Sequence, residues 1–189
     1  MKEFTFTPEM TVLDLGFSEI EYSDTDNYLE KHYPHQSKIT ALGIDQPKEF
    51  LQRYPKVKCV SYDGTTFPFT DKQFDICWSN AVMEHVGDRQ QQLRFLSEIR
   101  RVAKHGFLTT PNKHFPIEVH TRVPLLHLLP KPWFDAILRK LGKNWATGDY
   151  MHLFSEKDLR RTLAEAGYKK YRIIKNRILF WPVDFVVVF

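Results

Sequence analysis

The residues best suited to chemistry are polar groups that each follow a short apolar segment. Asp45, at the end of "ITALGID", could accept hydrogen bonds from both hydroxyls of a ribose ring. Asp63, in "VSYDGTT", could accept one from an adenine amino group, while the backbone N–H that follows, that of Gly64, faces the ring. Together these residues describe an adenosine site.

Apolar runs of strand length alternate with helical patterns along the chain. The expected strands are 12–15, 39–44, 57–62, 74–79 and 107–110, with a final pair at 171–174 and 185–189. This alternation predicts an α/β sandwich with a mainly parallel sheet, because parallel neighbours need helical crossovers. Ligands of such sheets bind beyond the carboxyl ends of the strands, where the acids lie.

Helix boundaries can be read from capping residues. A helix is expected from Asp88 as its N-cap to Gly106 as its stop. A second should open on a capping box of Ser155 and Asp158 and close at Gly167. The stretch "NYLEKHYP" is consistent with a short helix.

The stretch 63–86 carries "DG", "FPF", "FD" and "AVMEHV" in that order. It closely resembles the core of class I S-adenosylmethionine-dependent methyltransferases, in their small-molecule, type-11-like branch, whose motif runs D-x-x-x-L-P-F-x-D-x-x-F-D. Phe67 stands where that motif has Leu. The resemblance covers roughly 11–112, and more loosely the final strand pair. It implies S-adenosylmethionine as cofactor and a Rossmann-like, doubly wound, mostly parallel sheet with a C-terminal antiparallel strand pair.

Carried over residue by residue, the resemblance implies that Asp45 binds the ribose, that Asp63 and Gly64 bind the adenine, and that Asn80 lies near the methionine part. Each acid also has a purely structural interpretation. Asp45 could cap a helix beginning near Pro47, and Asp63 could only close a turn with Gly64. Their joint placement at successive strand ends favours the ligand.

The first turn departs from the family pattern D-x-G-x-G-x-G. Asp14, Gly16 and Phe17 are the expected cofactor contacts there, but Ser18 and Ile20 replace the later glycines. Either the loop takes another path and still offers N–H groups, with its acids near the sulfonium or amino group, or the site is closed. We expect a working site. A nicotinamide dehydrogenase fits worse, because its G-x-G-x-x-G is missing.

Methyl transfer needs alignment of the acceptor and, for a protonated acceptor, a base. His85, Glu118 and His120 are the candidate catalytic residues. His85 could instead be a structural residue at the start of a helix. A zinc site built from His114, His120 and His127 has no common spacing and no nearby cysteine, so no metal is expected.

The segment 111–152 is the expected lid and specificity element. Its helix should place five apolar side chains on one face: Trp133, Phe134, Ile137, Leu138 and Leu141. Basic residues flank that face, which would suit a hydrophobic or anionic acceptor, including a lipid-linked one. Ordinary packing of the helix into the core is the alternative.

Length and charge limit the remaining classes. The 189 residues fit one domain, 1–189, and carry a net charge of +4. Residues 1–50 hold four Lys and ten acids, whereas 131–177 hold twelve Lys or Arg and five acids. The basic part leaves a weak membrane-surface contact open, but no nucleic-acid module is present and none is expected as a partner.

No run is long enough for a membrane span, and no signal region opens the sequence. Cys59 and Cys77 read as reduced thiols, so a cytoplasmic protein is expected. The function that follows is S-adenosylmethionine-dependent methylation of oxygen or nitrogen in a small molecule of sugar, lipid or natural-product type. The alternative is a non-catalytic binding or scaffold protein that keeps the fold.

Overall fold

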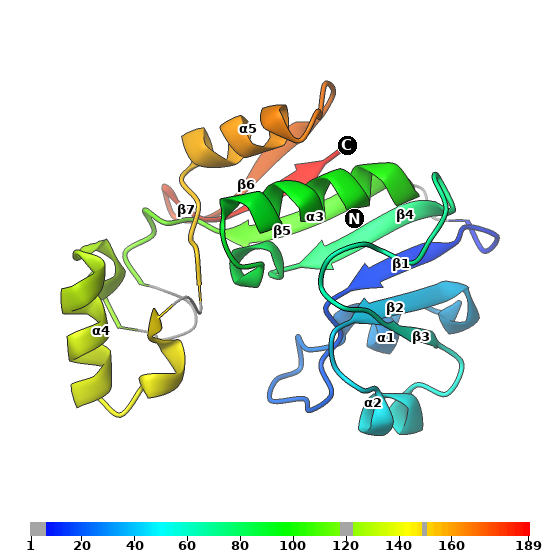
Figure 1. The fold of residues 1–189 in the computed structure, drawn as a ribbon, viewed down its shortest axis with the longest axis horizontal. Coiled ribbons are helices and arrows are strands. Elements are labelled where there is room, and N and C mark those ends of the chain that lie inside the picture. Colours follow the sequence, from blue (N-terminus) through cyan, green and yellow to red (C-terminus); the bar gives the residue numbers. More distant parts are fainter. Residues whose placement is uncertain (1–6, 118–122, 149–150) are drawn as a thin grey trace. The chain divides into compact units, whose positions relative to one another are not determined.

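The computed structural model describes residues 7–117, 123–148 and 151–189 (Figure 1). Its strands form a seven-stranded sheet in the order β3-β2-β1-β4-β5-β7-β6. The strands are Val12–Leu15 (β1), Ile39–Gly43 (β2), Lys58–Ser61 (β3), Phe74–Asn80 (β4), Ala103–Pro111 (β5), Arg172–Ile178 (β6) and Trp181–Val188 (β7).

Helices connect these strands. The α-helices are Tyr28–His32 (α1), Lys48–Arg53 (α2), Arg89–Val102 (α3), Lys131–Lys140 (α4) and Glu156–Glu165 (α5). Short 3₁₀ helices are Gln36–Lys38 (η1), Met83–His85 (η2), Leu126–Leu128 (η3) and Asn144–Ala146 (η4).

The first four strands are parallel, with β1 paired to β2 and to β4, and β2 paired to β3. Successive residues of one strand point to opposite faces, yet Val12 and Leu13 are both fully buried, as are Ala41 and Leu42. Both faces of this part of the sheet are therefore covered. That burial explains why these segments read as unbroken apolar runs.

The last strand runs antiparallel to β5. Gly106 and Phe189 exchange backbone hydrogen bonds of 3.1 and 3.2 Å, and Asn112 donates its N–H to Val183 at 2.9 Å. The numbers in each pair change in opposite directions, as antiparallel pairing requires. The predicted Rossmann-like sheet, mostly parallel with a C-terminal antiparallel strand pair, is confirmed.

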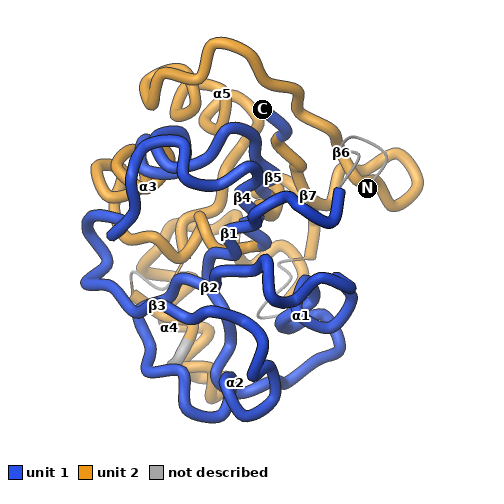
Figure 2. The backbone as a smooth tube through the Cα atoms, turned by 90° about the vertical axis from the view of Figure 1, so that its right-hand side faces the viewer, with its two compact units in different colours: residues 1–80, 97–108, 188–189 blue, residues 81–96, 109–187 orange. Residues whose placement is uncertain are grey.

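The chain forms two compact units, coloured separately in Figure 2. Unit 1 consists of residues 1–80, 97–108 and 188–189, and unit 2 consists of residues 81–96 and 109–187. In unit 1, α1 and α2 pack on one face of the sheet through a shared apolar core. Its buried members are Val12, Phe17, Leu29, Ile39, Ala41, Phe50, Tyr54, Val57 and Trp78.

The predicted stop of α3 at Gly106 is wrong. The helix does open on Asp88, whose carboxylate accepts the N–H of Gln91 at 2.9 Å, but it ends at Val102 and the chain passes directly into β5. Lys72 reaches the helix end, donating from Nζ to the carbonyls of Arg100 and Ala103. These bonds satisfy carbonyls that a glycine cap would otherwise serve.

Gly106 instead allows a close approach inside the sheet. A Cβ atom at this position would overlap the ring of Phe189 on the paired strand. The glycine is therefore required by packing and not by helix termination.

The second capping prediction is confirmed. Ser155 Oγ accepts the N–H of Asp158 at 3.1 Å, and α5 ends just before Gly167. The single apolar face predicted for α4 is only partly right. Phe134 and Leu138 pack with Leu126 and Ala146 in a small cluster of unit 2, whereas Trp133 and Leu141 are exposed because that cluster covers only one side of the helix.

Among the described helices, none combines the length and the hydropathy that crossing a membrane would require.

We expect Gly106→Ala to lower the free energy of unfolding by about 1–3 kcal/mol, because the added methyl group displaces the Phe189 ring. Urea denaturation measures the change. In a Phe189→Ala background the same substitution should cost much less. Equal costs in the two backgrounds would show that the ring contact is not the cause.

Candidate functional site

The four parallel strands end at one edge of unit 1. Leu15 lies opposite both Leu42 and Ser79 in the pairing register. Gly43 lies opposite Ser61. The chain leaves all four strands at about this level, so the four segments that follow them lie at the same edge (Figure 1).

The predicted cofactor-binding residues lie in β1, in β4 or within three residues of a strand end at this edge. They are Asp14, Gly16, Phe17, Asp45, Asp63, Gly64 and Asn80. The fold therefore brings together segments that are up to 66 residues apart in the sequence numbering, from Asp14 to Asn80.

Gly16 begins the turn after β1 in a conformation that favours glycine. Its φ is +86°, and its N–H donates to the carbonyl of Leu42 at 3.0 Å. An L-residue with a Cβ is disfavoured at this φ. The one glycine that the turn shares with the family pattern is thus the one that its backbone needs.

Phe17 turns its ring into the core of unit 1 instead of toward solvent. The ring lies 4.7 Å from that of Phe50, between centroids, and a Cβ added to Gly43 would lie 2.5 Å from its Cε1 atom. This packing holds the turn against the end of β2 and the start of α2. A contact of Phe17 with a cofactor would therefore involve its backbone.

Side chains hold the rest of the turn in place of the absent glycines. Asn27, with φ +49°, accepts the N–H of Ser18 at 2.8 Å and donates from Nδ2 to the carbonyl of the same residue at 2.9 Å. Asp26 accepts the N–H of Ser23 at 2.9 Å. These side-chain hydrogen bonds fix the path of the turn.

Glu19 caps α2, which Asp45 was one candidate to do. Its two carboxylate oxygens accept the N–H groups of Glu49 and Phe50 at 2.5 and 3.1 Å. These donors are orphan groups of the first helical turn, so the contact fixes the loop to α2.

Glu21 ties the loop to both helices. Its carboxylate accepts hydrogen bonds from Asn27 and Tyr54, each at 2.7 Å, and pairs with Lys31 at 3.0 Å. Partial burial acts to raise its pKa, but these hydrogen bonds and the ammonium group outweigh burial and lower the pKa to about 2. Glu19 and Glu21 thus support the loop structurally.

Asp14 faces a second acid, Glu30 of α1, which the sequence patterns did not single out. Both are buried, at 6% and 0% exposure. Burial raises the pKa of each carboxyl group, and the charge of Glu30 raises that of Asp14 further. The Glu30 carboxyl group interacts with Asp14 and with its own backbone N–H, and no cationic side chain among the described residues pairs with it.

The two strand-end acids, Asp45 and Asp63, differ in the hydrogen bonds of their carboxylates. Asp45 is exposed, and no hydrogen bond links its carboxylate to another described residue. Asp63 Oδ1 accepts from the N–H and the hydroxyl of Thr65 at 2.9 and 2.6 Å, which lowers the pKa of Asp63. Asp63 therefore closes its own turn, as the structural interpretation predicted, with Gly64 inside that turn.

The candidate catalytic residues are only partly described. His85 is exposed in η2, next to Glu84, which is fully buried and accepts the hydroxyl of Thr110 at 3.2 Å. The buried acid was missed because its neighbours gave no periodic pattern. Glu118 and His120 lie outside the described residues.

No group of three or more His, Cys, Asp or Glu side chains is placed to hold a metal ion in the described part of the chain.

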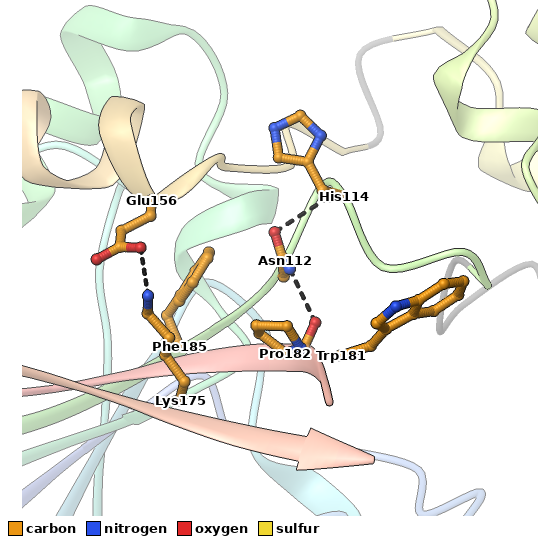
Figure 3. Close-up of a pocket in the computed structure, with 7 residues that line it drawn as sticks. All are labelled: Asn112, His114, Glu156, Lys175, Trp181, Pro182 and Phe185. Atoms are coloured by element: carbon orange, nitrogen blue, oxygen red, sulfur yellow. Dashed lines mark hydrogen bonds and ion pairs between the residues drawn. The ribbon is translucent and has the colours of Figure 1, made fainter. Parts of the chain in front are cut away.

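A pocket of 260 Å³ lies in unit 2, beyond the end of β5 (Figure 3). It is lined by Asn112, His114, Glu156, Lys175, Trp181, Pro182 and Phe185. Asn112 uses its side chain within the wall, accepting the N–H of His114 and donating to the carbonyl of Pro182. Lys175 pairs with Glu156 at 2.6 Å, and His114 also lines the wall.

Residues 25–108 match the family model described as "Methyltransferase domain". The matched range begins after most of the glycine-poor turn and ends within β5. No curated protein matches the chain.

Solved structures share the fold at low identity. A SAM-dependent methyltransferase from Aquifex aeolicus is 20% identical with a TM-score of 0.59, over 99% of this chain and 85% of that chain. The 1,6-didemethyltoxoflavin-N1-methyltransferase of Burkholderia thailandensis, solved with its substrate and S-adenosylhomocysteine, is 17% identical with a TM-score of 0.55, over 95% and 69%.

The [4+2]-cyclase SpnF is 16% identical with a TM-score of 0.54, over 88% of this chain and 54% of that chain. One fold therefore supports more than one reaction. The family match and the structural relatives together confirm the predicted resemblance to class I methyltransferases in family model and fold.

We expect Glu21→Gln to lower the melting temperature at neutral pH, because the carboxylate is held ionised in the folded protein. The folded-state pKa is about 2 and the ordinary value 4.5, so this stabilisation is present above about pH 5 and is lost as the pH falls toward 2. Thermal melts across that range should bring the variant and the parent together at low pH. A constant difference at all pH values would contradict the assignment.

Glu30→Gln should act in the opposite direction. Because burial raises the pKa of Glu30 and Asp14, the folded state holds protons more tightly, and stability is lost as the pH rises above about 4. The stability of the variant relative to the parent should therefore increase between about pH 4 and 8. Glu49→Gln, at an exposed position of α2, is the control. Parallel pH profiles for all three proteins would refute a shared buried carboxyl pair.

Proposed function

We propose that this chain, which carries a methyltransferase domain over residues 25–108 and the fold of S-adenosylmethionine-dependent methyltransferases, transfers a methyl group from S-adenosylmethionine to a small molecule. The observation that carries the proposal is the meeting of the β1, β2, β3 and β4 ends at one edge of unit 1, each followed by residues suited to part of the cofactor.

The edge fits the cofactor at several points. Asp45 is the ribose ligand, because its exposed carboxylate is free of other described partners and can accept both hydroxyls. Asp63 and Gly64 face the adenine, with one oxygen of Asp63 left beside the one that holds Thr65. Gly16 allows the backbone to approach closely.

The methionine part of the cofactor falls to Asp14, Phe17 and Asn80. Asp14 and Glu30 form a buried acid pair that has no paired cation among the described residues, and a cationic ammonium group would compensate such a pair. The Phe17 backbone and the Asn80 side chain supply polar groups at the same edge. This arrangement is the strongest sign that the altered turn still belongs to a working site.

When bound, S-adenosylmethionine supplies a methyl group on a positively charged sulfur. The protein's task is to align the acceptor in line with that bond, to exclude water and to receive a proton where the acceptor carries one. His85, Glu118 and His120 are the proposed catalytic residues for this proton. Oxygen and nitrogen acceptors both fit such a mechanism.

The acceptor side is proposed to involve the 111–152 segment within a single domain, 1–189. The pocket beyond β5 offers an imidazole, that of His114, and an aromatic wall, that of Trp181, which suit a small molecule with apolar and anionic parts. Both described cysteines are free thiols, which supports a cytoplasmic protein.

One observation favours the alternative, a non-catalytic binding protein with this fold. Glu19, Glu21 and Asp26 all bond within the turn or to neighbouring helices, and Asp63 holds Thr65. A turn so fully satisfied needs no ligand for its order.

Isothermal titration calorimetry with S-adenosylhomocysteine separates these functions. We expect binding by the parent protein, and Asp45→Ala should weaken it by about 1–3 kcal/mol, roughly 5- to 150-fold in Kd, through loss of the ribose hydrogen bonds. Asp71→Ala is the matched control, because Asp71 is exposed and forms only a surface pair with Arg101.

Absence of heat at high ligand concentration, from a protein that melts cooperatively, would exclude the enzyme and favour the binding protein. Equal losses in Asp45→Ala and Asp71→Ala would leave the fold in place but remove Asp45 from the cofactor site.

A further inference from the structure

The turn between β6 and β7 exposes four consecutive apolar side chains in unit 2. Ile178, Leu179, Phe180 and Trp181 have exposed fractions of 60%, 88%, 69% and 46%. We call residues 178–181 the hairpin tip. Arg177 closes the turn by donating from Nη1 to the carbonyl of Phe180 at 3.0 Å, so the tip is a structured loop.

The composition of the tip does not serve the turn. Leu179 and Phe180 form a two-residue loop, and Leu179 has φ +56°. Asn and Gly are favoured in such loops because they adopt positive φ readily, whereas Leu does so at a cost. Leu and Phe also expose apolar surface to water here. Leu179 and Phe180 disfavour this turn and add no stability to the fold, which indicates a function for their exposed side chains.

The hairpin carries more basic than acidic residues. Its strand β6 has Arg172, Lys175 and Arg177, and β7 has one acid, Asp184. Lys175 is paired with Glu156. Because β6 is the last strand in the sheet order, some of these charges protect an open strand edge. Edge protection accounts for charges on the strand, but not for the apolar tip.

The size and shape of the tip favour a lipid surface over a folded protein. A stable protein interface needs roughly 20–30 residues a side, far more than four side chains at the end of a two-stranded hairpin provide. Phe180 and Trp181 meet edge to face at 5.4 Å between centroids. Aromatic rings with an adjacent arginine are typical of the membrane–water interface, where the rings sit at headgroup depth and the cation meets phosphate.

We infer that the hairpin tip docks on the surface of an anionic phospholipid bilayer. The side chains of residues 178–181 enter the headgroup region, while the exposed Arg177 at the base of the tip lies against the anionic headgroups. Trp181 also lines the pocket of Figure 3, so the docked tip holds that pocket next to the bilayer. This inference stands independently of methyl transfer.

Sedimentation with vesicles tests the inference. The parent chain should co-sediment with phosphatidylcholine vesicles that contain phosphatidylserine, and added salt should weaken the binding. Leu179→Ser with Phe180→Ser should reduce the partition coefficient by about tenfold or more. Leu141→Ser is the matched control, since Leu141 is 53% exposed in the same unit but directly follows α4; it should bind as the parent does.

Trp181 supplies a second readout at the tip itself. Brominated lipids should quench part of the tryptophan fluorescence of the parent, and Trp181→Phe should lose that part while keeping cooperative thermal unfolding. Binding of S-adenosylhomocysteine by the tip variants, compared with the parent, reports the proposed cofactor site separately from the membrane contact.

Three results would overturn the inference. The first is no vesicle binding by the parent chain, and the second is binding that the tip double variant retains in full. The third is equal binding to vesicles of phosphatidylcholine alone, which would remove the anionic partner. A dimer in sedimentation velocity that the tip variant abolishes, without vesicle binding, would assign the tip to self-association instead.

Discussion

The turn after β1 is held by side-chain hydrogen bonds at positions where the family pattern has flexible glycines. Gly16 alone adopts the left-handed conformation that the exit from the strand requires. Asn27 then bonds both polar groups of the Ser18 backbone, and Glu19 caps α2. These bonds fix the turn after β1 to the starts of α1 and α2, and that turn forms one part of the candidate cofactor edge.

The four acids around this turn fall into two groups. Glu19 and Glu21 are satisfied by helix N–H groups, amides and cations, and they hold the loop. Asp14 and Glu30 are buried against each other and have raised pKa values because of that burial. A stable loop therefore lies beside a buried acid pair that has no paired cation among the described residues.

The C-terminal part of the chain also combines polar side chains that stabilise the fold with apolar side chains that are exposed for no folding reason. The capping box of α5 and the pair of Lys175 with Glu156 fulfil ordinary folding roles. Leu179 and Phe180 do not, since each is exposed in a turn that would form more readily with polar residues. Exposed residues that lower the stability of the fold are candidates for contacts with a binding partner.

The sequence by itself determined the alternating elements, the edge that gathers Asp45 and Asp63, and the capping of α5, because periodicity and caps are local properties of neighbouring residues. Only the tertiary structure decided that α3 ends at Val102, where Lys72 from a distant loop bonds carbonyls near the helix end. Gly106 instead makes room for the ring of Phe189. The tertiary structure also decided that Glu19 rather than Asp45 caps α2, and that Glu30 faces Asp14. Those contacts join residues far apart in the chain, and a local sequence pattern does not indicate which of several suitable side chains will make each contact.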